Sequence, residues 1–525
     1  MNDKHSFAGY VEYNGEQYYC MVNDYRVKFI YGHTGNQESN FIYDNEKEYL
    51  YGVDDTGRPF ALLAEKGVLK KNVVSLPQTI AGTLQDSAFG LPVIASFFTP
   101  VVIRGKPVRI PHEALHNQQE ERLIKTKLVK DDLSKLNRID FVGETINRVS
   151  NLRMAVNQMD NGVNVRNIVF GGVNNEERKE SDFSYALKSP DEYNRIYDVD
   201  IDGTAAKLIS SYWHTSIGSN AGSIYAPIAI NSAISLRFTE SRSIKKLKKY
   251  YLAVYDFLCF LTGQQNIGFA IKLFNDDHFL GDCFFWNKDV EYYKGGFDNT
   301  IQIEELGDKL PNVFDMFAGG DRKVLRFLPE NNRVISRVSH TILYTDVCEL
   351  CTAFEVEFAL YAGSLSKEEK ATLKAIDMLT ALRKHLKLSC ETFRDSDNKD
   401  INPYRTDFLS KNSNKEQIEQ YNYLFKNALG SISHMDLPIK HRIFLLYKRT
   451  LEDHDTVSEE QYDKMKEYIG VLVDFRNDKQ HEDKINWGEC EKVFRVLCRI
   501  LYINLLLRAK LDKKDAIRLA DKVWC

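Results

Sequence analysis

The sequence lacks any apolar stretch long enough to cross a membrane. Its longest nearly apolar run, residues 91–103, is interrupted by Pro92 and Pro100, whereas a spanning helix needs about 20 apolar residues. We therefore predict buried strands in this run. The first residues have neither the basic nor the apolar part of a secretory signal peptide, so we expect none.

A strong charge of either sign is also lacking. The 70 Lys and Arg against 74 Asp and Glu leave a net charge of −4, so no field of the whole protein attracts nucleic acid or anionic lipid. Any RNA or DNA site must be a local patch. Nine cysteines in 525 residues are an odd and scattered set, which indicates no disulfide framework and favours a reducing, cytoplasmic location.

Glycine-rich loops that bind phosphate are absent, because neither GxxxxGK[ST] nor GxGxxG occurs. Cys348 and Cys351 form a CxxC pair without a second pair or suitably spaced histidines, so we assign them to the core. Residues 198–203 resemble the start of an EF-hand loop, but Ile209 occupies the twelfth position, where a bidentate Glu is required. The alternation of acids and aliphatic residues there is typical of a half-buried strand.

His112, Glu113 and His116 match the HExxH signature of zinc metalloproteases. Pro111 precedes the motif directly, so a helix would begin at the motif itself and the apolar turn that usually precedes it is missing. Glu144 is available as a third ligand, but nothing singles it out. We favour a solvated helix start and keep a zinc hydrolase as an open alternative.

Local pattern predicts a β-rich first part. Residues 1–110 contain short runs of Tyr, Val, Phe and Ile, with Asp55-Thr56-Gly57 as a turn. Residues 112–138 are polar and helical. Residues 243–263 form an amphipathic helix that ends at Gly263, and strands continue to about residue 328.

From about residue 337 strand patterning almost vanishes and helices follow. We predict helices at 338–362, 367–389, 414–429, 438–451, 458–479 and 489–510, and a short one to 524. The fold class is therefore α+β, with a β-rich N-terminal lobe at 1–335 and an all-α domain at 336–525. Whether the lobe divides into two subdomains near 110–140 stays open.

Arg476 lies in the apolar stripe of the predicted helix 458–479. With 100° per residue and Met465 at 0°, Ile469 falls at about 40°, Leu472 at about 340° and Arg476 at about 20°. A guanidinium that is always charged needs an anion in such a position. Three interpretations stay open: Arg476 binds an anionic ligand, it pairs with an acid of a neighbouring helix, or it extends its charged end into solvent at the end of its own helix.

His481 follows five residues later. The polar run 477–480 indicates that the helix ends or loosens there, which lets His481 turn back toward Arg476. A permanent cation and a group that titrates near neutrality are then neighbours. Glu355 and Glu357, on the first helix of the domain, are candidates for a further acid.

The motif Arg476-Asn477-x-x-x-His481, late in a helical domain, resembles the Rx4H motif of HEPN-type ribonucleases. The segments FAGYVEYNG, YLYGVDDTGRPFALL and YYLAVYDFLCFLTG resemble ApeA-type proteins. Proteins of that type join a β-rich N-terminal domain to a C-terminal HEPN nuclease, and they act in bacterial abortive-infection defence against phage.

The resemblance implies a metal-independent endoribonuclease without cofactor that acts as a homodimer. Arg476 would bind the phosphate, and His481 of each copy would serve as base or acid. Asn477 would orient His481 or bind phosphate, and Lys479 would contact RNA. The β-rich lobe would be a sensor that restrains the nuclease until a phage component binds. The sequence leaves open which RNA is cleaved, and tRNA is one candidate.

Two alternatives to this nuclease remain. One is a non-catalytic HEPN module, in which Arg476 and His481 stabilise a dimer or hold a ligand. The other is the zinc hydrolase built on His112, Glu113 and His116. The two belong to different classes of protein and predict different outcomes for substitutions at these residues.

Overall fold

Two compact units make up the chain, residues 1–322 and 323–524. The computed structural model describes residues 6–13, 16–23, 25–30, 48–64, 93–99, 101–106, 118–150, 194–216, 228–264, 267–285, 300–318, 344–364, 374–410, 413–433, 438–451, 459–477 and 487–524. The division between the units falls at a point outside these residues, as does the boundary expected at 335/336. The assignment of 1–335 to a sensor lobe therefore stays a prediction.

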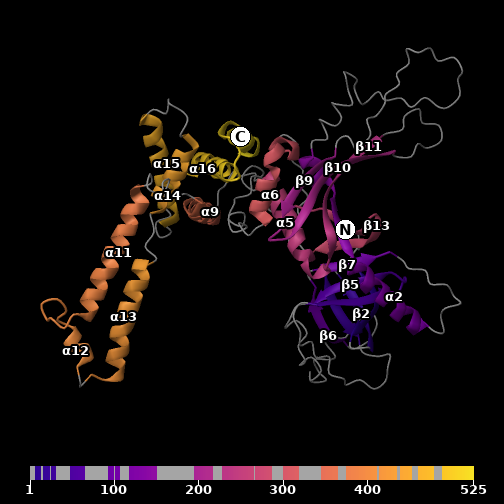
Figure 1. Ribbon diagram of the computed structural model, residues 1–525, viewed down its shortest axis with the longest axis horizontal. Helices are drawn as coiled ribbons and strands as arrows, with labels where there is room; N and C mark the ends of the chain where they lie inside the picture. The colour runs from indigo at the N-terminus through magenta and orange to yellow at the C-terminus, as the bar shows by residue number, and fades with distance from the viewer. Residues whose placement is uncertain are drawn as a thin grey trace, which may run out of the picture. The chain divides into compact units, whose positions relative to one another are not determined.

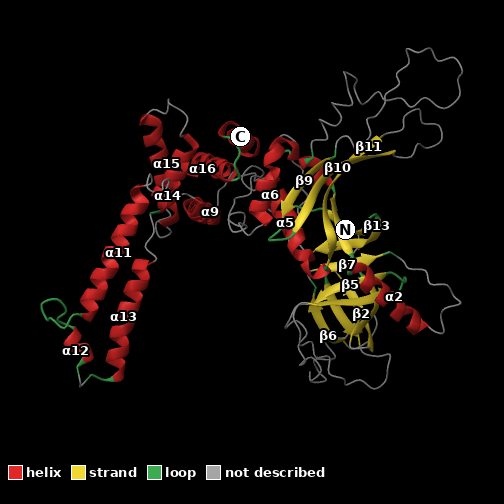
Figure 2. Ribbon diagram, in the orientation of Figure 1, coloured by secondary structure: helices red, strands yellow, loops and turns green. Residues whose placement is uncertain are grey.

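Strands dominate the first unit (Figure 2). They are β1 (Phe7–Tyr13), β2 (Glu16–Asn23), β3 (Arg26–Ile30), β4 (Glu48–Asp54), β5 (Pro59–Ala64), β6 (Val93–Phe98), β7 (Val101–Gly105), β8 (Leu136–Val142), β9 (Arg195–Asp200), β10 (Ala205–Ser216), β11 (Ile228–Arg242), β12 (Ala270–Asn275) and β13 (His278–Phe285). The described strands form one 13-stranded sheet in the order β6-β3-β2-β1-β4-β5-β7-β13-β12-β8-β11-β10-β9. All the described pairings are antiparallel.

The turn between β4 and β5 confirms the turn expected at residues 55–57. The carboxylate of Asp54 accepts hydrogen bonds from the backbone N–H groups of Thr56 (3.0 Å) and Arg58 (2.8 Å). Gly57 has a φ of 77°, a left-handed conformation that favours glycine. Asp54 is buried and its charge is met by Arg104 of β7 at 2.5 Å. The side chain of Asp54 therefore ties this turn to a third strand.

The strands expected at 91–103 are confirmed as β6 and β7, and Val101, Val102 and Ile103 are buried. β7 pairs with β5 on one side and with β13 on the other. This pairing joins the first seven strands to the strands that follow residue 135. One hydrogen-bonded sheet therefore continues on both sides of the region 110–140.

The helical prediction for 112–138 is right in its middle and wrong at its end. Helix α2 covers Gln118–Leu133, but residues from Leu136 onward belong to β8. β8 lies between β11 and β12 and buries Leu136, Ile139 and Phe141. Pairing with strands about 100 and 130 residues later in the chain decides this segment, and no local pattern shows those partners.

The helix expected at 243–263 is confirmed. A 3₁₀ turn, η5 (Ile244–Lys246), leads into α5 (Leu247–Thr262), and Gly263 ends the helix in the left-handed conformation. The remaining described helical elements of this unit are α3 (Glu144–Val149), η7 (Ile303–Lys309) and α6 (Leu310–Ala318). α5 packs against α6 through aromatic pairs, Phe257 with Phe314 (5.3 Å) and Phe260 with Phe317 (4.9 Å).

The described residues of the second unit form helices and no strand, which confirms the α+β class (Figure 1). The helices are α9 (Tyr344–Ser364), α11 (Lys374–Asp395), α12 (Arg405–Leu409), α13 (Lys415–Ser433), α14 (Ile439–Leu451), α15 (Glu459–Asn477), α16 (Trp487–Arg508) and α17 (Lys513–Trp524). α9, α14, α15 and α16 pack on one another, and α17 packs on α16. α11 packs along α13.

None of the described helices combines the length and the apolar character that spanning a bilayer requires. Cys351 of α9 is buried, which confirms its assignment to the core, and Cys348 is half-buried. Residues 198–202 alternate between exposed acids and buried aliphatic side chains, as expected of a half-buried strand, with Val199 and Ile201 buried.

We predict that Gly281→Ala weakens the joint between β7 and β13. A methyl group at position 281 would lie against the carbonyl oxygen of Arg104, closer than contact distances allow. Such overpacking costs about 1–3 kcal/mol of unfolding free energy, measurable by urea titration of the full chain. The control is Gly363→Ala in α9, where nothing lies within 4 Å. That change should stabilise the chain by up to about 1 kcal/mol.

Candidate functional site

Helix α15 brings Arg476 to the rim of the four packed helices. Met465, Ile469, Leu472 and Val473 of α15 are buried, which confirms the apolar stripe read from the sequence. Arg476 is the second-last residue of α15 and its side chain is 29% exposed. The helix therefore buries its apolar face up to the last turn and leaves the guanidinium partly accessible to solvent.

Glu355 of α9 is the partner of Arg476. Nη1 of Arg476 donates a hydrogen bond to Oε1 of Glu355 at 3.0 Å, and the Glu355 side chain is 32% exposed. The sequence left open whether Arg476 would meet an anionic ligand or an acid of a neighbouring helix. The structure shows the acid, 121 residues earlier in the chain.

The ion pair stabilises the charged form of the guanidinium. Partial burial lowers the pKa of Arg476, but the hydrogen bond and the negative charge of Glu355 outweigh burial, so the pKa lies above its ordinary value. Because each side chain of the pair is about a third exposed, a phosphate oxygen that reaches the rim meets a cation already held in position. The bond to Glu355 uses one of the donors of the guanidinium fork.

Tyr344 fixes the end of α15 against the start of α9. Its hydroxyl donates to the backbone carbonyl of Arg476 at 2.9 Å, and its ring lies 6.0 Å from that of Phe475. A hydrogen bond with the Cys348 side chain is the largest cause that raises the pKa of Tyr344, while the charge of Arg476 lowers it. No local pattern indicates this contact, because a tyrosine near the start of a helix is ordinary.

Cys351 is a buried neighbour of this pair rather than a reactive group. Burial raises the pKa of its thiol to about 12, although the charge of Arg476 acts in the opposite direction. The thiol is therefore protonated near neutral pH and is a poor nucleophile.

Glu357 makes a different contact from that of Glu355. Its side chain is fully buried, and both of its oxygens accept from Arg508 of α16 at 3.0–3.2 Å. Residues two apart on a helix point about 200° apart, so one acid faces the interior and the other faces the rim. Of the two acids named from the sequence, only Glu355 contacts Arg476 in the described residues.

The other predicted site residues lie at or beyond the end of α15. Asn477 is the last described residue of α15, and its side chain is not among those described; the helix end expected within 477–480 stays a prediction. Lys479 and His481 fall in 478–486, and His112, Glu113 and His116 fall in 107–117; both segments lie outside the described residues. Whether Arg476 and His481 meet therefore stays a prediction.

The described residues contain no group of three or more His, Cys, Asp or Glu side chains arranged to hold a metal ion. At the EF-hand-like segment the carboxylates have protein partners. Asp200 accepts from the N–H of Gly203 at 2.6 Å, and Asp202 pairs with Lys249 at 2.8 Å. These contacts account for Asp200 through turn geometry and for Asp202 through an ion pair.

Comparison with family models, with curated proteins and with solved structures gives no match for this chain. The geometry around Arg476 therefore carries the functional argument together with the motif in the sequence.

We predict that the two acids of α9 differ sharply in their contribution to stability. Glu357→Gln leaves Arg508 without its buried counter-charge and should cost about 3–5 kcal/mol of unfolding free energy. Glu355→Gln removes a half-exposed pair and should cost less than about 1 kcal/mol. Urea unfolding of both variants measures the difference, and equal losses would show that Glu355 is also a structural residue.

Proposed function

We propose that this protein is a metal-independent endoribonuclease of the HEPN type that cleaves cellular RNA during phage infection. One observation supports the proposal: Arg476, about a third exposed, is held near the end of α15 by Glu355, five residues before His481. This is the placement that the Rx4H motif requires of its arginine, at a helix end and accessible to a phosphate.

The proposed reaction uses the 2′-OH of the RNA as the nucleophile. One His481 accepts the 2′-OH proton while the 2′-oxygen bonds to phosphorus, and the bond from phosphorus to the 5′-oxygen breaks. An acid, His481 of a second copy, protonates the leaving oxygen. Arg476 binds the nonbridging oxygens where negative charge develops. Asn477 orients His481 or binds phosphate, and Lys479 contacts the RNA backbone.

In this scheme Glu355 is a positioning residue for Arg476. It holds the guanidinium by one donor, and the remaining donors of the planar fork are suited to phosphate oxygens. Resemblance to ApeA-type proteins supports two further parts of the proposal. The β-rich region restrains the nuclease until a phage component binds, and the protein acts as a cytoplasmic homodimer.

The ion pair also favours a second candidate, a non-catalytic HEPN module in which Arg476 serves the protein itself. In that case Arg476 and Glu355 link α15 to α9, and the unit binds a partner or ligand. The two candidates differ in what the alanine variants lose.

We expect Arg476→Ala and His481→Ala each to lower RNA cleavage by about 10²–10⁴-fold, the usual size of a lost acid, base or phosphate contact. Thermal unfolding should change little, because Arg476 and its partner Glu355 are each about a third exposed, and such pairs contribute little to stability. Arg518→Ala is the matched control, since Arg518 forms a half-exposed helical pair with Asp515 away from the motif, and it should cleave normally. Full cleavage by both variants would favour the non-catalytic module.

We expect products with 2′,3′-cyclic phosphate and 5′-OH ends, formed equally well in EDTA. Sequencing of RNA ends from infected cells that carry the wild type or the His481→Ala variant identifies the RNA that is cut. Products with 3′-OH ends, or cleavage lost in EDTA, would contradict the proposed chemistry.

A further inference from the structure

Residues 374–433, called here the helical arm, form a helical hairpin within the second unit. α11 and α13 run side by side (Figure 1). The short helix α12 lies between them in the sequence and packs on α13. An aromatic pair links the two long helices, Phe393 of α11 with Phe425 of α13 at 6.0 Å, and Tyr421 of α13 lies 4.8 Å from the same Phe425 ring.

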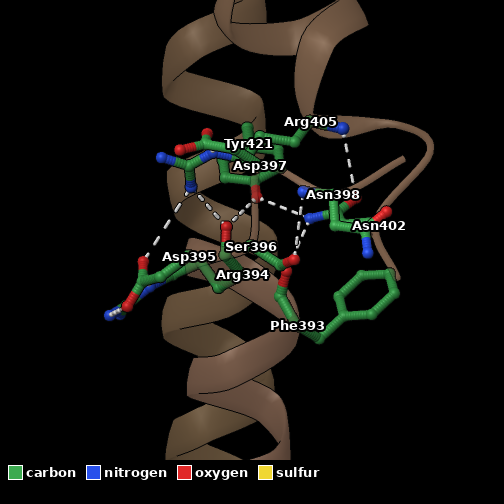
Figure 3. Close-up of polar contacts among 9 residues, drawn as sticks. All are labelled: Phe393, Arg394, Asp395, Ser396, Asp397, Asn398, Asn402, Arg405 and Tyr421. Atoms are coloured by element: carbon green, nitrogen blue, oxygen red, sulfur yellow. Dashed lines mark hydrogen bonds and ion pairs between the residues drawn. The ribbon is translucent and has the colours of Figure 1, made fainter. Parts of the chain in front are cut away.

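The end of the arm is closed by a hydrogen-bonded network (Figure 3). The amide of Asn402 donates to the carbonyl of Phe393 at 2.8 Å and to the hydroxyl of Tyr421 at 3.0 Å, and that hydroxyl donates to the carbonyl of Arg394 at 2.6 Å. Asn402 and Tyr421 are both buried. The network satisfies carbonyls at the end of α11, so the connection is a built turn that holds the two helices together.

The arm leaves most of its apolar side chains exposed. Nine of the eleven large apolar side chains that are exposed in the described residues belong to the arm. They are Met378, Leu382, Leu388, Phe393, Ile401, Tyr404, Ile418, Tyr423 and Leu424. Tyr421 is the one apolar side chain of the arm's described residues that is more than nine-tenths buried. Such a concentration of apolar surface is typical of an interaction site.

Two helices alone form a single layer, which cannot bury an apolar stripe on both of its sides. On α11, Met378, Leu382 and Phe393 fall within about 60° of one another at 100° per residue. Met378 and Leu382 form an apolar stripe one turn long, and the exposed His385 and Ser389 separate it from Phe393. An apolar stripe of this kind is buried when a second layer of helices packs on it.

Basic side chains predominate in one part of the arm and acidic side chains in another. Residues 378–394, called the shaft, carry four basic and one acidic side chain, a net charge of +3. Residues 395–410, called the tip, carry two basic and four acidic side chains, a net charge of −2. Two parallel arms would place like charges together, whereas two antiparallel arms place the tip of one beside the shaft of the other.

We propose that the helical arm is a self-association surface, covered by the arm of a second copy of this chain in antiparallel orientation to form a two-layer bundle of four helices. α11 has 22 residues, and at 1.5 Å per residue and about 10 Å of width per helix each arm offers about 660 Å². Two arms then bury about 1,300 Å², which lies within the range of stable protein interfaces, about 1,200–2,000 Å².

Sedimentation equilibrium of the full chain tests the proposal. The double variant Met378→Glu with Leu382→Glu should weaken association at least tenfold and halve the mass of the assembly, because it places charges in the apolar stripe. Leu128→Glu is the matched control, since Leu128 is a helical leucine of α2 that is 40% exposed, against 44% for Leu382. An unchanged assembly in the double variant would overturn the proposal.

Charge exchange tests the antiparallel orientation without altering the apolar stripe. Lys384→Glu with Lys387→Glu makes shaft and tip both acidic, and Asp400→Lys with Asp407→Lys makes them both basic. Each double variant should lose association with itself at least tenfold, and an equimolar mixture of the two should regain it. Failure of the mixture to associate would overturn the antiparallel arrangement. Arg476→Ala should leave association by the arm unchanged, which separates this result from the proposed nuclease activity.

Discussion

The hydrogen-bonded ion pair between Arg476 and Glu355 is the contact on which the functional argument depends. An arginine cannot lose its charge at any physiological pH, so its place at the end of an apolar helix face requires an anion. The protein provides that anion from α9, and the pair stays about a third exposed. A cation held in this way is fixed by the protein and still accessible to a ligand phosphate.

Helix α9 carries one charge that is buried in the packed helices and one that stays accessible to solvent. Glu355 and Glu357 are two residues apart on α9, and the helical repeat turns them to nearly opposite sides. Glu357 is fully buried and forms a bidentate pair with Arg508, which links α9 to α16. Glu355 faces the rim, where Tyr344 also holds the last turn of α15. The packed helices therefore act as a rigid support for a group at their edge.

Local pattern predicted the regular elements well where the pattern was strong. The helix at 243–263 was placed together with its end, because Gly263 has the left-handed conformation that an amphipathic run followed by glycine favours. The turn at Asp55–Gly57 followed from turn residues between two β-rich runs. Residues 136–138 were assigned to a helix and belong to β8, because hydrogen bonding to β11 and β12 overrides local propensity.

Among the site residues, the sequence alone determined that Arg476 lies on the apolar stripe of a helix, and it predicted that this helix ends or loosens within residues 477–480. Both conclusions depend on the 3.6-residue repeat and on the polar run that follows, which are properties of neighbouring residues. Tertiary structure decided that Glu355 rather than Glu357 meets Arg476, that Tyr344 holds the end of the helix, and that α11 and α13 pack on each other with their apolar stripes left partly open. These contacts join residues far apart in the chain, so they depend on how helices pack and not on any pattern within one of them.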